Sequence, residues 1–347
     1  AITFEEAIAN FNSKNYVEAY DQFSELALDD DANAQYNVAL MNYKGLGVNK
    51  NLKLAFFWYE KAALNGNFVA QNNLAHMYYL GEEVKKDLAL AEKWYKISAE
   101  ANYPLAQLNL GLLYDSSSNE EKVKEAFFWY QKASEQGVII AQNNLAKMYY
   151  TGRGTKLDKQ KALYWFEKSA AASNPIAQAN LAMMYLTADG VTKDINKAIL
   201  LLTKSAEQEE IEAQFLLGIC YENGRGTAQD FQKATNWYLK AALSGHTSAQ
   251  FNLGNIYFVG KGVEPDYKEA VLWYSKAAEN GHVKSQFVLA GCCYAGKGIT
   301  KDLQKAVKWF TKAAEQGEPT SQFFLGLSYY NGQGITQDYE KAFEWFK

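Results

Sequence analysis

The side chains best suited to bind a metal ion are the three histidines of the chain, His76, His246 and His282. His246 and His282 lie 36 residues apart, and most of the sequence repeats at that interval. If each interval is one helical hairpin, the two imidazoles are separated by about 10 Å, the spacing of packed helices. That distance is too long for shared coordination of one ion, and no His-Glu-x-x-His motif or carboxylate cluster lies nearby. We therefore predict no metal site.

The cysteines and one glycine-rich segment are the remaining candidates for catalysis. Cys220, Cys292 and Cys293 are odd in number and include an adjacent pair, which is not a disulfide framework. The segment from Gly291 to Lys297 imitates a phosphate-binding P-loop, but glycine replaces the required serine or threonine at 298 and no strand precedes it. Because function must be argued from an assembled site and none assembles, we predict a protein that is not an enzyme and needs no cofactor.

A repeat of 36 residues organises the chain. A small residue followed by glutamine recurs at this spacing, with one spacing of 35 in the third unit. The small residue, numbered here as repeat position 0, is residue 34, 70, 106, 141, 177, 213, 249, 285 and 321. Position 21 is alanine in all nine units, and all eight tryptophans lie at position 24, counting one residue less in the third unit. One such unit cannot bury its tryptophan alone, so the units must stack.

Each unit is predicted to form two helices joined by a turn. Apolar residues at positions 0, 4 and 8 follow helical spacing, and a Gly-x-Gly turn comes next. An aspartate then begins the second helix in seven units, where its carboxylate accepts from free amides of the first turn. These residues are Asp87, Asp158, Asp194, Asp230, Asp266, Asp302 and Asp338. In the third unit Asp115-Ser-Ser-Ser-Asn-Glu replaces the glycine turn, so we expect that edge to bulge or move.

The pattern Ala-Gln-x-Asn-Leu, Gly-x-Gly and Asp-x-x-Lys-Ala-x-x-Trp-x-x-Lys-Ala-Ala resembles the Sel1-like repeat, a relative of the tetratricopeptide repeat. The resemblance covers residues 34–347 as nine repeats, the last ending inside its second helix. It implies an all-α fold, a continuous right-handed α-solenoid of antiparallel helix pairs. Residues 1–33 lack the glycine turn and resemble a tetratricopeptide-type helix pair that caps the N-terminal end, with Thr3 and Glu6 as a capping box.

Charge and composition limit the partners and the compartment. The net charge of −4 gives no reason to expect nucleic acid, and no stretch approaches the roughly 18 apolar residues of a transmembrane segment. The chain begins at Ala1 without methionine, as an exported protein does after signal cleavage and as a trimmed chain also does. We expect an exported, secreted or periplasmic protein, with the cytoplasm as the alternative.

The first candidate binding surface is the outward side of the first helices. On a helical wheel, positions 2 and 9 lie opposite the core, yet both are often aromatic. The rings are Tyr36, Phe215, Phe251, Phe287 and Phe323 at position 2, and Tyr43, Tyr79, Tyr150, Phe258, Tyr294 and Tyr330 at position 9. First helices line the concave side in the families that the chain resembles, so these rings would line a groove for a peptide or helix. The alternative is that curvature buries them between adjacent first helices.

Asparagines recur beside these rings at position 3. They are Asn37, Asn73, Asn109, Asn144, Asn180 and Asn252. A row of side-chain amides offers both donors and acceptors to an extended peptide backbone. The alternative is a hydrogen bond between repeats that sets the stacking angle.

The second candidate surface is the edge formed by the turns. Arg153, Arg225, Lys261 and Lys297 occupy the centre of Gly-x-Gly turns and would line up along one side. Such an edge could recognise phosphate groups of anionic lipids or proteins. The alternative is solvated loop charge, and no aromatic residues interleave as single-stranded nucleic acid requires.

Together these features predict a protein–protein interaction scaffold or adaptor that binds a partner in its groove. In repeat number and expected export the chain resembles bacterial virulence factors of the LpnE and EnhC type, which act on host-cell entry or trafficking. That resemblance implies a host protein as the partner. Two alternatives are an endogenous scaffold for envelope or signalling assembly and a phosphoinositide or membrane-surface binder that uses the turn edge.

Overall fold

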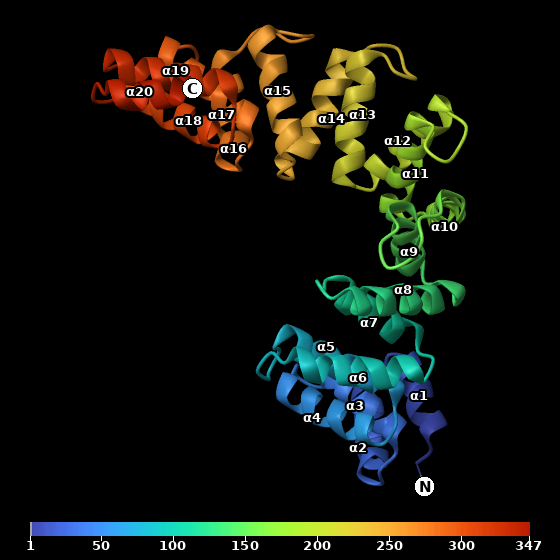
Figure 1. Cartoon of the computed structure of the whole chain (residues 1–347). Helices are drawn as coiled ribbons and strands as arrows, with labels where there is room; N and C mark the ends of the chain where they lie inside the picture. Colours follow the sequence, from blue (N-terminus) through green and yellow to red (C-terminus); the bar gives the residue numbers. More distant parts are fainter. Residues whose placement is uncertain (1) are drawn as a thin grey trace. The chain divides into compact units, whose positions relative to one another are not determined.

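The computed structural model describes residues 2–347, which form twenty α-helices and no β-strand (Figure 1). The chain divides into two compact units, Ala1–Ala172 and Ser173–Lys347, called unit 1 and unit 2 below. None of the helices in residues 2–347 combines the length and the apolar character that a bilayer crossing needs.

Helices follow one another as hairpins in both units. In unit 1 they are α1 (Phe4–Asn12), α2 (Tyr16–Leu28), α3 (Ala32–Lys44), α4 (Leu52–Leu64), α5 (Phe68–Leu80), α6 (Leu88–Glu100), α7 (Pro104–Asp115), α8 (Glu120–Glu135), α9 (Ile139–Thr151) and α10 (Lys159–Ala171). In unit 2 they are α11 (Pro175–Thr187), α12 (Ile195–Glu207), α13 (Ile211–Asn223), α14 (Phe231–Leu243), α15 (Thr247–Val259), α16 (Tyr267–Glu279), α17 (Val283–Ala295), α18 (Leu303–Glu315), α19 (Pro319–Asn331) and α20 (Tyr339–Phe346).

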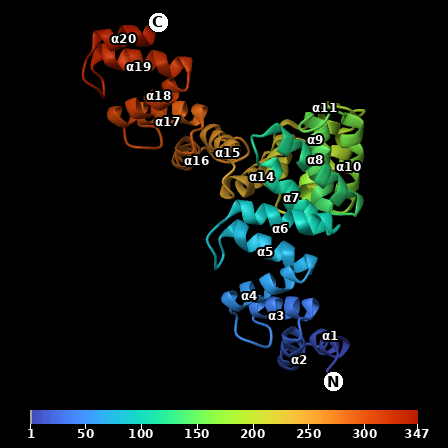
Figure 2. The same ribbon diagram turned by 60° about the horizontal axis from the view of Figure 1, so that its bottom comes forward.

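Each repeat contributes one such hairpin. From α3 onward an odd-numbered helix is the first helix of a repeat and the next even-numbered helix is its second. Figure 2 shows the pairs α3/α4 and α5/α6 following one another in unit 1. The predicted all-α fold of tandem helix pairs is therefore confirmed.

The helix starts are capped as the sequence indicates. All seven predicted aspartates accept a backbone N–H of the first turn, for example Asp158 from Lys161 at 3.0 Å. At the N-terminal end Thr3 and Glu6 form the predicted capping box. These bonds satisfy amides that have no partner inside the helix, so α1 and the seven second helices each start at a defined residue.

A buried glutamine connects each repeat to the one before it. Gln71 at position 1 donates from Nε2 to the carbonyl of Ala63 at the end of α4, at 3.2 Å. The same bond recurs between Gln250 and Ala242 at 3.1 Å in unit 2. The residue at position 0 is alanine or serine without exposed surface, which lets the helices approach closely enough for this bond.

The tryptophans of position 24 fill the space toward the preceding repeat. Trp273 on α16 is 4% exposed and packs with Tyr238 and Ala242 of α14. Trp94 on α6 packs in the same way against the core around Tyr59 of α4. Stacking thus buries an aromatic surface that a single hairpin would leave in water, as the repeat pattern predicts.

The third repeat departs from the others at its turn. No bulge forms there, contrary to our expectation, because α8 starts early and has 16 residues, against 13 in most second helices. Asn119 caps this longer helix by accepting from Glu121 and Lys122. The short turn leaves a hollow of about 740 Å³ beside the next turn, at Ser117, Ser118 and residues 152–156.

The two glycines of each Gly-x-Gly turn have different tasks. Gly296 and Gly298 both have a positive φ, of 71° and 74°. A Cβ on Gly298 would lie 2.1 Å from the carbonyl oxygen of Tyr267, at the start of the preceding second helix. A Cβ on Gly296 would come no closer than 3.1 Å to any atom, and that atom belongs to its own turn. The second glycine is therefore a contact between repeats.

This difference predicts unequal costs for two similar substitutions. Gly296→Ala should cost roughly 1 kcal/mol, the strain of an alanine in the left-handed region. Gly298→Ala should cost at least about twice as much, because the turn must also move away from α16. Urea unfolding of the two variants measures both values. Equal losses of stability would contradict the inter-repeat contact.

Candidate functional site

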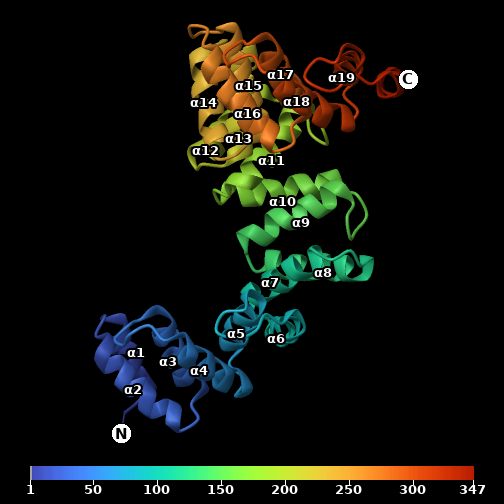
Figure 3. The same ribbon diagram turned by 90° about the vertical axis from the view of Figure 1, so that its left-hand side faces the viewer.

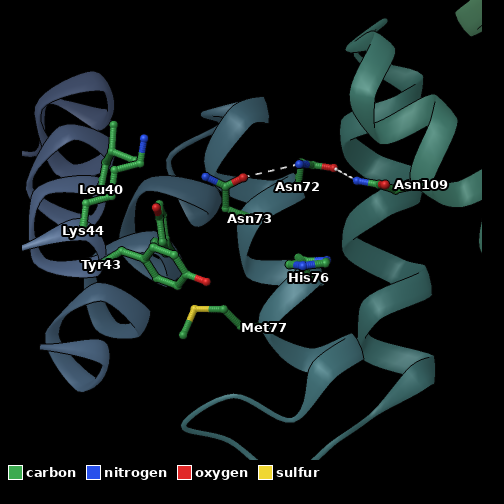
Figure 4. Close-up of a pocket in the computed structure, with 9 residues that line it drawn as sticks. Leu40, Tyr43, Lys44, Asn72, Asn73, His76, Met77 and Asn109 are labelled. Carbon is green, nitrogen blue, oxygen red and sulfur yellow. Dashed lines mark hydrogen bonds between the residues drawn. The ribbon is translucent and has the colours of Figure 1, made fainter. Parts of the chain in front are cut away.

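The first helices of unit 1 enclose a pocket of about 350 Å³ (Figure 4). We call it the first-helix pocket. Its lining residues are Leu40, Tyr43 and Lys44 of α3, Tyr59 of α4, Asn72, Asn73, His76 and Met77 of α5, and Asn109 of α7. Three consecutive repeats therefore contribute to one site. Leucine, methionine and tyrosine supply an apolar wall, and the asparagines supply amides.

The amides in this pocket form a short chain. Asn109 donates from Nδ2 to Oδ1 of Asn72 at 2.9 Å, and Asn72 donates to Oδ1 of Asn73 at 3.3 Å, as the dashed lines in Figure 4 show. The hydroxyl of Tyr59 lies beside Asn73. Each side-chain amide carries two N–H groups and an oxygen that accepts two bonds. The chain therefore keeps spare donors and acceptors for a ligand.

Tyrosines of position 25 lie beside asparagines of the next repeat. The Tyr130 hydroxyl donates to Asp115 at 3.3 Å and the Tyr238 hydroxyl donates to Glu222 at 2.7 Å, each in its own repeat. Asn144, Asn252 and Asn73 neighbour the hydroxyls of Tyr130, Tyr238 and Tyr59. Burial raises the pKa of all three phenols well above the usual value, so the hydroxyls stay protonated. All three asparagines therefore lie beside a ring of the preceding repeat, which favours the alternative that they set the stacking.

The other predicted asparagines differ in their surroundings. Asn37 is buried and donates to the carbonyl of Asn33 in its own helix at 2.8 Å. Asn109 belongs to the pocket described above. Asn180 lies half-buried on α11 in unit 2. The asparagines thus occupy equivalent repeat positions, but the structure brings only Asn73 and Asn109 of the predicted set together in the first-helix pocket.

The rings of position 2 are less exposed than the helical wheel predicts. Tyr36, Phe215, Phe251 and Phe287 are half-buried, and only Phe323, at 52%, is exposed. Tyr36, Phe215, Phe251 and Phe287 pack on the aromatic ring of position 25 in their own repeat, with centroids 5.9 to 6.3 Å apart. The wheel fails because the second helix and the next first helix both cover this side.

The rings of position 9 lie nearer to the solvent. Tyr79 and Tyr330 are 40% and 52% exposed, whereas Tyr43 and Tyr150 are half-buried. Tyr43 lines the first-helix pocket and donates to Glu82 of the next turn at 3.1 Å. His76 lies beside it, and its Nδ1 is hydrogen-bonded to the Tyr95 hydroxyl at 3.1 Å. The sequence suggested only a possible metal ligand at His76.

A second pocket, of about 480 Å³, lies on the first helices of unit 2. Ser248, Phe251, Asn252, His282 and Lys284 line it together with neighbouring backbone. His282 caps α17 by accepting at Nδ1 from the backbone N–H of Ser285. Its ring packs on Phe251 with centroids 4.9 Å apart. Here an aromatic ring replaces the amide chain of unit 1.

The bases of the turn edge contact the preceding repeat. Arg153 pairs with Asp115 at 3.4 Å, and Lys261 pairs with Glu222 at 3.3 Å. Arg225 donates to the carbonyl of Leu186 at 2.8 Å. Every one of these partners occupies position 9 of the repeat before.

The fourth base follows the same rule with a different interaction. The ammonium of Lys297 lies 4.5 Å from the ring centroid of Phe258, also at position 9 of the repeat before, and 4.3 Å from that of Tyr267. The four side chains therefore connect repeats. To bind a phosphate, they would have to give up these contacts.

The candidates for metal binding and nucleophilic chemistry are the histidines, the acidic side chains and the cysteines. No group of three or more histidine, cysteine or acidic side chains there could hold a metal ion. The three cysteines are buried and unpaired, and burial raises the pKa of Cys292 to about 11. Such a thiol stays protonated at neutral pH, and the thiolate is the reactive form.

The repeats of this chain match those of a known protein family. A model of the Sel1 repeat matches nine consecutive segments, residues 32–67, 69–103, 104–138, 139–174, 175–210, 211–246, 247–282, 283–318 and 319–347. The chain belongs to the Sel1 repeat family. Sel1-repeat proteins are generally protein-interaction scaffolds, and their fold is typically non-catalytic.

Two solved structures share this fold. One is a protective antigen present in uropathogenic strains of Escherichia coli, 34% identical, with a TM-score of 0.69 over 99% of this chain and 82% of that one. The other is a Sel1 repeat protein from Oxalobacter formigenes, 31% identical, with a TM-score of 0.64 over 83% of this chain and 84% of that one. No curated protein matches the chain.

The cap of α17 should make unit 2 sensitive to acid. Burial, and then the charge of Lys284, lower the pKa of His282 below 6.5. A lowered folded pKa means that the stabilisation is complete above the unfolded value of about 6.5 and is lost as the pH falls from there through the folded pKa. Asparagine can cap a helix, as Asn67 caps α5, but its side chain does not titrate. His282→Asn should therefore flatten the stability–pH curve between about pH 7 and pH 5. An unchanged curve would exclude His282 as its source.

Proposed function

We propose that this Sel1-repeat scaffold binds an extended peptide segment of a partner protein along the first helices of unit 1. The observation that carries the proposal is the first-helix pocket, where an apolar wall lies beside a chain of amides with spare hydrogen-bonding capacity. An extended peptide needs both, because it presents backbone N–H and C=O groups together with its side chains.

The spacing of the repeats suits such a ligand. Consecutive first helices are separated by about 10 Å, and an extended chain rises about 3.3 Å per residue. Each repeat therefore corresponds to roughly three peptide residues. Amides on α5 and α7 can bond the backbone at two points, while Leu40 of α3 and Met77 of α5 contact an apolar side chain on the α3 side of these amides (Figure 4). Lys44 at the rim favours an acidic residue in the peptide.

We further propose that the protein is an exported bacterial factor that acts on host cells, in entry or trafficking. The similarity to a protective antigen of uropathogenic Escherichia coli, 34% identical over nearly the whole chain, supports this proposal. An antigen protects only when antibodies or immune cells reach it, which favours a protein outside the bacterial cytoplasm.

Export has a direct test. Cells that express the natural full-length gene are separated into culture medium, envelope and cytosol, and each fraction is blotted with an antibody against this chain. The protein should appear in the medium or the envelope while a cytosolic marker stays in the cells. Confinement to the cytosol would contradict export and leave peptide binding untouched.

Peptide binding is tested with peptides selected from a displayed random library against the purified chain. Asn109→Ala should weaken the selected peptides roughly fivefold, the effect of about 1 kcal/mol for one lost hydrogen bond. Leu40→Asp should weaken them further by placing a charge on the apolar wall. Binding is measured by fluorescence anisotropy.

Asn37→Ala is the matched control. It removes an asparagine at the same repeat position whose amide bonds only its own helix, so peptide affinity should stay the same. Thermal unfolding of each variant shows whether the fold is kept. Equal affinities for the Asn109→Ala and Leu40→Asp variants and the parent chain would contradict the first-helix pocket as the peptide site.

A further inference from the structure

The second helices carry a repeated lysine that the first-helix pocket does not use. Position 27 is lysine in seven repeats, namely Lys61, Lys132, Lys168, Lys204, Lys240, Lys276 and Lys312. All seven side chains are exposed on the side of the second helices that faces the solvent. A lysine in the last turn interacts favourably with the helix dipole, which explains one charge per helix but not the pattern around it.

Aromatic rings lie beneath these ammonium groups in both units, and the distances are shortest in unit 2. Lys240 and Lys276 each lie 4.3 Å from the ring centroid of the tryptophan three residues before them, and Lys312 lies 4.7 Å from that of Trp309. Within the described part of unit 2 no carboxylate pairs with any of the three. Their positive charge is therefore fixed in place and not neutralised.

A second row of lysines runs beside the first. Position 20 is Lys197, Lys233 and Lys305 in three of the four complete repeats of unit 2. Seven residues are two helical turns, so positions 20 and 27 share one face about 10 Å apart. Helices α12, α14, α16 and α18 together carry nine lysines against four glutamates. The corresponding helices of unit 1, α4, α6, α8 and α10, carry ten lysines against eight glutamates.

Apolar side chains lie between the two rows. Leu200 and Leu272 at position 23 are 56% and 45% exposed. The helices follow in order along unit 2, because Trp273 of α16 packs on α14, and Val271 and Tyr274 of α16 share a core with α18 (Figure 3). Position 27 is lysine on all four helices of this face, and the exposed leucines between the two rows belong to α12 and α16.

We propose that this second-helix face of unit 2 binds the surface of an anionic phospholipid bilayer. The array extends in two directions, which suits a sheet of phosphate groups, whereas a linear polyanion would contact one row. Long lysine side chains reach phosphates with the ammonium while their stems stay against apolar atoms. The leucines between them enter the boundary of the acyl chains. A nucleic acid or a glycan has no such apolar layer.

This face differs from the turn edge in one decisive respect. The bases of the turns already contact the preceding repeat, whereas Lys240, Lys276 and Lys312 contact only a tryptophan of their own helix. Binding a phosphate there breaks no contact between repeats. The membrane surface of the protein is thus assigned to unit 2 and to the side away from the first helices.

The test is vesicle binding by the whole chain, with phosphatidylglycerol mixed into phosphatidylcholine as the anionic surface. A triple variant, Lys240→Glu, Lys276→Glu and Lys312→Glu, should lose on the order of a hundredfold in affinity, since each lysine near an anionic surface contributes about fivefold. The matched control is Lys61→Glu, Lys132→Glu and Lys168→Glu in unit 1, which makes the same charge change at the same repeat position. It should bind within a few-fold of the parent. Circular dichroism checks that both variants stay folded.

A second variant separates a bilayer from other polyanions. Leu200→Ser with Leu272→Ser should weaken vesicle binding and leave binding to heparin and to single-stranded DNA unchanged, because it removes insertion and keeps charge. Equal losses in the two lysine variants would overturn the assignment to unit 2. The proposal that the ligand is a bilayer would be overturned by either of two results. One is a parent chain that does not bind the vesicles at low salt, and the other is a leucine variant that binds them as well as the parent does.

Discussion

A hydrogen bond from a buried glutamine to the end of the preceding helix sets the relation of each repeat to the one before it. The donor is Nε2 at position 1, and the acceptor is a backbone carbonyl eight residues earlier, which also accepts the N–H of the turn residue three positions after it. The donor–acceptor distances stay between 3.1 and 3.3 Å. Burying the Nε2 group without this acceptor would cost about 1 to 3 kcal/mol, so the bond tolerates little change in stacking.

This constant geometry arranges the variable residues. Because each repeat is placed on the last in the same way, side chains at one repeat position form a row within a unit. In some rows the side chains make contacts between repeats, as the turn bases do with position 9 of the repeat before. In other rows the side chains remain accessible to a ligand. The residues that line the first-helix pocket and the lysines of unit 2 are examples.

The two units use one scaffold for different surfaces. Position 2 in unit 1 includes Asn72 and Asn143, and an amide chain follows at the first-helix pocket. In unit 2 the same position is phenylalanine in four repeats, and His282 packs on one of these rings. The second helices differ as well, since glutamates nearly balance the lysines in unit 1 and do not in unit 2. A solenoid can change its binding chemistry in this way without changing its core, because the core uses other positions.

The repeat period, the helix pairs and their starts could be predicted from the sequence, because they depend on local rules. Alanine at position 21, tryptophan at 24 and the capping aspartates act within a hairpin or between neighbours, and nine copies make the pattern plain. The tyrosines of position 25 were missed, although they follow the tryptophan in most repeats. Their role lies in the hydroxyl, and a repeat pattern shows that a ring is present, not what its oxygen reaches.

Sequence alone therefore determined the class of fold, the register of the repeats and the residue types of each row. Tertiary structure decided which members of a row meet a neighbour and which meet solvent. Arg153 and Lys240 are both basic residues at a regular position, yet the first reaches an aspartate of the preceding repeat and the second lies over its own tryptophan. That difference depends on distances across a helix interface, and these are set by the stacking of whole helices, not by spacing along the chain.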